Sequence, residues 1–167
     1  SAPREVARLR RIAACSRVRA APYDAPPMEW GVVYYKTQSG SVPAEDFLDN
    51  CPTKVDANFN AVLDAVRKAP PPAFSGGGKW EAMRASMSGY YEIRGTGPGR
   101  AHYRLFCVLD NGTPEELAQR GFDRPQIAVI NGMVKPNAAL FSDAEYRKNV
   151  RDLGDDYRAT MPRRIAE

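Results

Sequence analysis

Apolar and polar residues alternate along this chain with two periods, which separate predicted strands from predicted helices. Aromatic and β-branched residues over 30–35 predict a first strand. Alternating runs over 87–94, 101–109 and 126–134 predict three more strands, and the glycine-rich turn over 95–99 joins two of them. The pattern therefore indicates a small sheet whose last three strands follow one another along the chain.

Helical periodicity appears on both sides of these strands. Residues 43–49 predict a short helix, and a longer one begins after Pro52, where apolar residues recur at helical spacing. This apolar stripe consists of Val55, Phe59, Val62, Leu63 and Val66. Residues 114–120 predict one helical turn. Ser142 and Glu145 form a capping box that begins a final helix. The apolar face of that helix carries Tyr146, Val150, Leu153 and Tyr157.

These elements predict an α+β fold with a small antiparallel sheet. We expect a three-strand meander and an N-terminal edge strand, packed against two N-terminal helices, with a C-terminal helix. Residues 28–167 form the single predicted domain, and residues 1–27 form a basic Ala/Arg-rich extension that is peripheral or flexible. The extension could also be an RNA-binding arm. The glycines at 76–78 lack the lysine and the preceding strand of a phosphate loop, which favours a connector.

Composition narrows the function classes. The first 27 residues contain six arginines, one Glu and one Asp, and so account for the whole net charge of +4. The pI therefore does not by itself indicate nucleic-acid binding. No apolar run approaches the ~20 residues of a membrane helix, and the three cysteines lack metal-ligand spacing. We expect a cytoplasmic protein without metal or cofactor, in which Cys107 is a buried strand residue.

Basic residues on two neighbouring strands form the candidate site. Strand periodicity puts Glu92 and Arg94 on one face, and puts His102 and Arg104 on one face of the next strand. Across a hairpin these faces coincide, and Lys135 follows the last strand closely enough to close the group from the side. Burying an arginine side chain costs free energy, so several arginines on one face of a sheet favour an anion-binding surface.

Metal-free RNA cleavage requires such a surface. A base removes the 2′-hydroxyl proton, an acid protonates the leaving 5′-oxygen, and cations stabilise the phosphate. Glu92 or His102 could transfer protons, while Arg94, Arg104 and Lys135 could hold the phosphate. The candidate RNA-binding residues are Lys79, Arg84, Arg100, Asn137, Tyr91 and Phe141. Two structural alternatives stay open: Glu92 and Arg94 pair on a solvated face, and His102 is a structural histidine.

The segments that carry these residues resemble the RelE/HigB superfamily of toxins from bacterial toxin–antitoxin pairs, in particular its phage-derived HigB-like branch. The resemblance covers roughly residues 29–158. It rests on the Trp-led first strand, on the stretches Gly89-Tyr-Tyr-Glu-Ile-Arg94 and Tyr103-Arg-Leu-Phe106, on Asn131-Gly-Met-Val-Lys135, and on a last helix rich in Tyr and Arg. The family commonly has two lysines after the last strand, and here only Lys135 is present.

The resemblance implies a fold with a microbial-RNase-like sheet. It also implies that the protein cuts mRNA in the ribosomal A site without metal and thereby inhibits translation. It implies that Arg94 and Arg104 bind or activate the scissile phosphate and that Lys135 assists. The implied partners are a HigA-like helix-turn-helix antitoxin and, through that antitoxin, operator DNA. Two other classes stay open: a catalytically weak module of the same fold that acts through an antitoxin and operator DNA, and a phage accessory protein.

Overall fold

One five-stranded mixed sheet organises the chain in a computed structural model that describes residues 28–71 and 78–167. The strand order is β1-β5-β4-β3-β2; β1 pairs with β5 in parallel and the other neighbours are antiparallel. The strands are β1 (Gly31–Tyr34), β2 (Trp80–Ala82), β3 (Tyr90–Thr96), β4 (His102–Asp110) and β5 (Gln126–Lys135).

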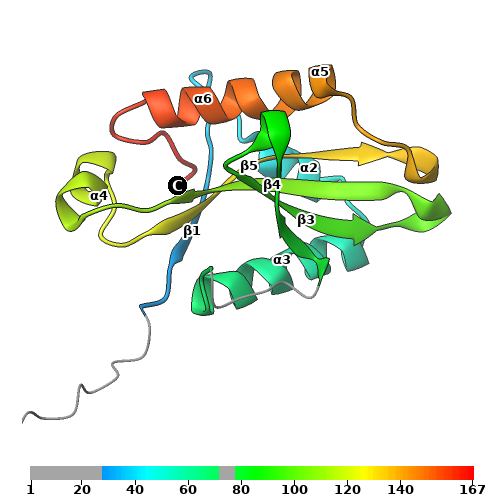
Figure 1. The fold of residues 1–167 in the computed structure, drawn as a ribbon, viewed down its shortest axis with the longest axis horizontal. Helices are drawn as coiled ribbons and strands as arrows, with labels where there is room; N and C mark the ends of the chain where they lie inside the picture. Colours follow the sequence, from blue (N-terminus) through cyan, green and yellow to red (C-terminus); the bar gives the residue numbers. More distant parts are fainter. Residues whose placement is uncertain (1–27, 72–77) are drawn as a thin grey trace, which may run out of the picture.

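Helices lie on both sides of this sheet (Figure 1). They are α2 (Pro43–Asp49), α3 (Thr53–Lys68), α4 (Pro114–Arg120), α5 (Asp143–Tyr146) and α6 (Asp152–Ala159), with a π-helical segment (Arg147–Arg151) joining the last two. Short 3-10 turns follow β2 (Ala85–Met87), β3 (Pro98–Arg100) and β5 (Pro136–Ala138). Thr113 and Ser142 each begin a helix with a capping box, as predicted for Ser142.

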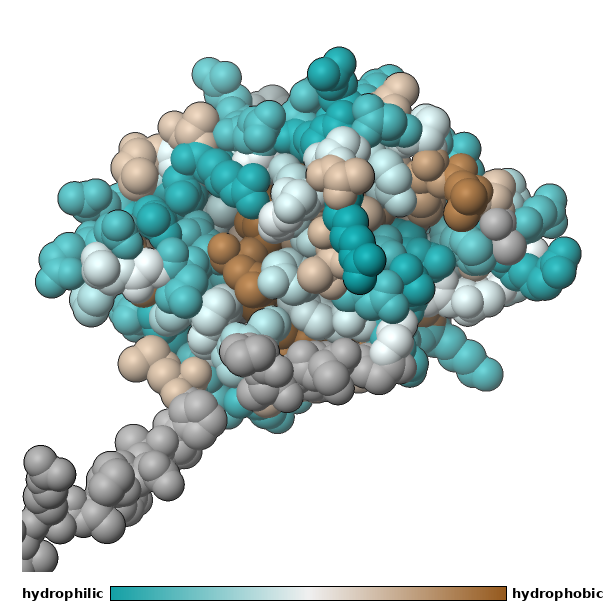
Figure 2. All heavy atoms as spheres, viewed as in Figure 1, coloured by the Kyte–Doolittle hydropathy of each residue, from teal (hydrophilic) through white to brown (hydrophobic). Residues whose placement is uncertain are grey.

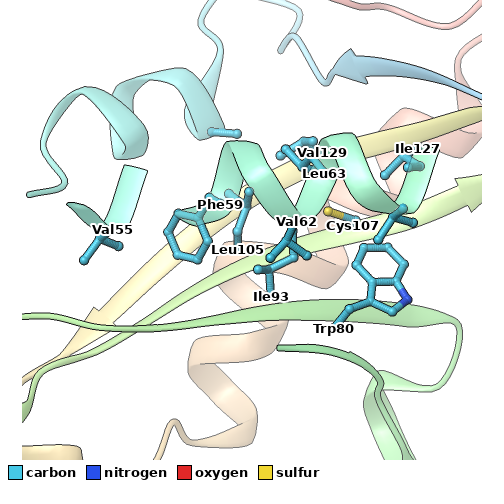
Figure 3. Packing of buried hydrophobic residues seen from close by; sticks show 12 residues of the cluster. Val55, Phe59, Val62, Leu63, Trp80, Ile93, Leu105, Cys107, Ile127 and Val129 are labelled. Carbon is cyan, nitrogen blue, oxygen red and sulfur yellow. The ribbon is translucent and has the colours of Figure 1, made fainter. Parts of the chain in front are cut away.

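Each face of the sheet has its own apolar core. On one face, the stripe of α3 packs against Ile93, Leu105 and Val129 (Figure 3). On the other, Val150 and Tyr157 of the C-terminal helices pack against the opposite side chains of the same strands. Figure 2 shows hydrophilic residues over most of the visible surface, with apolar residues in small groups. No helix within the described ranges is long and apolar enough to cross a membrane.

Two glycines let helices approach the strands closely. A Cβ at Gly132 of β5 would lie 2.0 Å from the Phe47 ring of α2, so this helix packs directly on the strand backbone. A Cβ at Gly95 of β3 would lie 3.2 Å from Val55 of α3. Both contacts bring helices close to the strand ends that carry the candidate site.

An irregularity in β5 meets another in the C-terminal helices. The β4–β5 register shifts between Phe106 and Cys107, which leaves one extra residue on β5 just before Asn131. The Asn131 amide then donates to the carbonyl of Asn149 in the π-helical segment, at 2.9 Å. A π-helical turn displaces its carbonyls from the regular α-helical pattern, and Asn131 satisfies one of them. This hydrogen bond ties the π-helical segment to β5.

A buried carboxylate ties the C-terminal segment to the sheet. Asp110 ends β4 with 5% of its surface exposed, and it accepts hydrogen bonds from Tyr157 at 2.7 Å, Arg120 at 2.7 Å and Arg163 at 3.0 Å. Beyond this cluster, Ile165 forms an antiparallel bridge with Tyr35. The last residues therefore continue along the outer edge of β1.

The α+β class, the N-terminal edge position of β1 and the helix over 43–49 are confirmed. The predicted turn over 114–120 is a seven-residue helix, and Cys107 is fully buried. The strand count was too low, because β2 was not predicted, and the sheet is mixed, because β1 pairs in parallel with β5. The extension over 1–27 and the connector over 72–77 lie outside the described residues.

Candidate functional site

The hairpin of β3 and β4 places the two candidate arginines opposite each other. Arg94 pairs with Arg104, Glu92 pairs with Phe106, and Thr96 pairs with His102. Residues directly across an antiparallel pair point to the same face, so Glu92, Arg94 and Arg104 share the face that α5 and α6 cover. The prediction that the two arginines share a face is thus confirmed by the register.

Glu92 lies at the centre of this group. Only 8% of its surface is exposed, and its carboxylate accepts from the Nε of Arg94 at 2.9 Å, with the Nε of Arg104 at 4.0 Å. A buried carboxylate requires such partners, because an isolated buried charge is strongly unfavourable. Arg94 therefore orients the Glu92 carboxylate, and Arg104 adds a second positive charge 4.0 Å away.

Arg104 is a partly buried cation with incomplete charge compensation. Its side chain is 14% exposed, and its Nη1 donates to the carbonyls of Tyr103 at 2.9 Å and Gly95 at 3.3 Å. Burial lowers the pKa of the Arg104 guanidinium, Glu92 opposes that shift and Arg94 adds to it. The nearest carboxylate in the described part of the chain is that of Glu92 at 4.0 Å, so an anion placed beside Arg104 would be stabilised.

Tyr146 joins the site from above the sheet, and the sequence analysis assigned it only to the helix face. Its ring packs edge-on against Phe106 at 5.7 Å. Burial raises the pKa of its phenol, the charge of Glu92 raises it further, and Arg104 and Arg94 oppose the shift. The Tyr146 phenol therefore keeps its proton at neutral pH.

Lys135 and His102 lie beside this centre. His102 pairs with Lys135 across β4 and β5, two positions along β4 from Arg104. The Lys135 ammonium contacts the Glu145 carboxylate at 2.6 Å, and both side chains are about one-third exposed. Lys135 therefore lies next to His102 on the β5 side, and its ammonium already has a carboxylate partner.

The Arg94 guanidinium also forms an ion pair with a second carboxylate, that of Glu81. Its Nη2 lies 2.8 Å from Glu81, which pairs with Glu92 across β2 and β3. These residues and Arg84 line an open hollow of about 610 Å³. The sequence analysis missed Glu81, because it did not predict the short strand on which Glu81 lies.

The remaining predicted residues divide into three groups. Phe141 is on the site face, where it packs against Phe106 and Tyr146 with ring centroids 6.5 Å and 5.8 Å away. Tyr91 is not: strand alternation turns it to the α3 face, and it stacks on Trp80 at 4.9 Å, so the structure gives it no place in the site. The exposed residues at the strand ends are Lys79, Arg100 and Asn137.

Arg100 and Asn137 lie in two turns that contact each other at one end of the sheet. Both residues adopt positive φ angles, 57° and 54°. They therefore extend the polar surface beyond His102 and Lys135.

No group of three or more His, Cys, Asp or Glu side chains lies together as a metal site in the part of the chain that the structure describes. No family model, curated protein or solved structure matches this chain.

Proposed function

We propose that this chain is the toxin of a toxin–antitoxin pair, a ribosome-dependent mRNA endonuclease that inhibits translation. The observation that carries the proposal is the apposition of Arg94 and Arg104 around the buried Glu92 carboxylate. Two guanidinium groups that flank one carboxylate fit a reaction in which a phosphate gains charge while a nearby hydroxyl loses its proton.

The proposed reaction is attack of an RNA 2′-hydroxyl on the neighbouring phosphorus. The 2′-oxygen–phosphorus bond forms and the phosphorus–5′-oxygen bond breaks, which leaves a 2′,3′-cyclic phosphate and a 5′-hydroxyl. Glu92 takes the 2′-hydroxyl proton, and Arg94 and Arg104 stabilise the phosphate charge. Tyr146 or His102 supplies the proton to the 5′-oxygen, and Lys135 assists. The corresponding partners are mRNA in the ribosomal A site, a HigA-like antitoxin and, through it, operator DNA, all in the cytoplasm.

One observation favours a second candidate function. Arg94 is paired with both Glu81 and Glu92, and Lys135 is paired with Glu145. A phosphate must compete with these carboxylates for the same cations. This neutralisation favours a catalytically weak module of the same fold, which acts through an antitoxin and operator DNA.

Controlled expression of the chain alone separates these functions. The toxin predicts growth arrest with cleaved mRNA, and loss of both in an Arg94→Ala/Arg104→Ala variant. The matched control is Lys68→Ala/Arg124→Ala, which removes two positive charges away from the site. Intact mRNA and normal growth at good expression would reject the endonuclease, and binding of an antitoxin by the same protein would then support the second candidate.

A further inference from the structure

A second hollow lies on the other side of Arg94, between the first turns of α3 and the end of β3. It has a volume of about 460 Å³. Its polar lining consists of Lys54, Asn58, Lys79, Arg94, Thr96 and Arg104. We call this hollow the α3 groove. Arg94 lines both it and the hollow that contains Glu81 and Glu92.

The groove exists because β2 is short. The β2–β3 pairing ends at Trp80 and Ile93, and the Arg94 amide donates to the Lys79 carbonyl at 2.9 Å. Beyond Arg94, no strand in the described residues pairs with this edge of β3. The close approach of α3 at Gly95 brings the helix to this uncovered edge. The Asn58 amide donates to the carbonyl of Arg94 at 3.3 Å and accepts from the Lys79 ammonium at 2.9 Å. Asn58 thereby positions Lys79 beside the strand.

The charge of this groove differs from that of the neighbouring hollow. Four cationic residues line it and no carboxylate does. Within the described ranges, Lys54 and Lys79 have no carboxylate within 4.0 Å, whereas Arg94 and Lys135 are both paired. Like charges that line one groove repel one another, and a bound anion relieves that repulsion. The α3 groove is therefore the place where this surface lacks negative charge.

We propose that the α3 groove binds a backbone phosphate of single-stranded RNA, next to the phosphate that Arg94 and Arg104 hold on the sheet. The inference rests on the proposed function and adds the path of the RNA strand, which runs around the open edge of β3. Arg94 and Arg104 both line the α3 groove, so the phosphate in the groove and the phosphate on the sheet are neighbours along one strand. Lys54 and Lys79 act as point charges on phosphate oxygens, and they contact no reacting atom.

The test uses a single-stranded 2′-O-methyl RNA octamer, which lacks the attacking hydroxyl and cannot be cleaved. Its affinity is measured by fluorescence anisotropy over a series of salt concentrations. For single strands, each lost phosphate contact lowers the steepness of log K against log salt by about 0.7, which corresponds to roughly fourfold in affinity at ~0.15 M salt. Because both lysines hold the same groove phosphate, Lys54→Gln/Lys79→Gln should lower affinity roughly fourfold by the same relation. Lys68→Gln, at the other end of α3, is the matched control and should bind as the wild type does.

The outcomes test RNA binding by the α3 groove independently of nuclease activity. Loss of affinity and of salt dependence in the double variant, with the control unchanged, supports the groove even if mRNA stays intact in cells. Wild-type affinity in the double variant overturns the groove even if the chain cleaves mRNA. Failure of the wild type to bind the octamer, or displacement of the octamer by an acidic peptide at equal charge, overturns RNA as the ligand of the groove.

Discussion

Replacing Asp110 with asparagine should destabilise the fold strongly. The Asp110 carboxylate is 5% exposed and is the shared partner of Arg120, Arg163 and Tyr157. The side chain of Arg163 is 8% exposed and that of Arg120 is 18% exposed. An asparagine side chain has nearly the same volume but no charge. Its NH2 group can only donate, and it would face the N–H and O–H donors that now bind the Asp110 carboxylate.

The expected cost follows from this geometry. Removing one partner from a buried ion pair costs about 3–5 kcal/mol, because the other charge is left uncompensated. In a domain of this size, each 1 kcal/mol lowers Tm by about 2–4 °C, so Tm should fall by roughly 6–20 °C. A loss of this size is a large part of the about 5–15 kcal/mol that stabilises a typical domain.

Urea denaturation followed by circular dichroism measures this loss. The midpoint should fall while the slope m stays unchanged, since the surface exposed on unfolding is the same. Asp123→Asn is the matched control, because Asp123 is exposed and lies in the connection that follows α4. A loss below about 1 kcal/mol, the range of exposed pairs, would show that the Asp110 cluster does not anchor the C-terminal segment.

Three further predictions concern the site, the packing and alkaline pH. Glu81→Gln should raise affinity for the RNA octamer by up to about fivefold, because a half-exposed ion pair such as Arg94–Glu81 is worth about 0–1 kcal/mol. Weaker binding by this variant would contradict competition between Glu81 and phosphate for Arg94. Gly132→Ala should lower the free energy of unfolding by about 1–3 kcal/mol in the same urea assay, because the alanine Cβ would meet the Phe47 ring. An unchanged midpoint would contradict this close packing. Burial, together with its hydrogen bond to Asp156, raises the pKa of Tyr35 to about 12. The native state therefore keeps the Tyr35 proton where the unfolded chain loses it, so stability should fall from about pH 10 to 12, less steeply in Tyr35→Phe.

Local patterns in the sequence predicted the local elements well. The stripe of α3 is buried as its period implied, and the capping box begins the final helix at Ser142. The alternation along β3 and β4 also placed Arg94 and Arg104 on one face. These predictions succeed because neighbours along the chain determine them.

Features set by distant contacts could not be predicted. The short strand β2 has three residues, too few to show a period, and with it the Glu81–Arg94 pair was missed. The parallel pairing of β1 with β5 joins residues far apart in the sequence. Tyr146 looks like any other apolar residue of its helix face, and only the packing of α5 over the sheet puts its ring against Phe106 and Phe141.

The parallel pairing of β1 has a consequence for synthesis of the chain. Gly31 pairs with Gln126, so β1 leaves the ribosome about 95 residues before its partner, which is roughly 5–20 s at ~5–20 residues per second. During that interval α2 and α3 emerge with apolar stripes that have only part of a sheet to cover them. A nascent chain with exposed apolar surface is prone to aggregate or to bind chaperones. The full sheet, and with it the candidate site, can assemble only after Lys135 has been made.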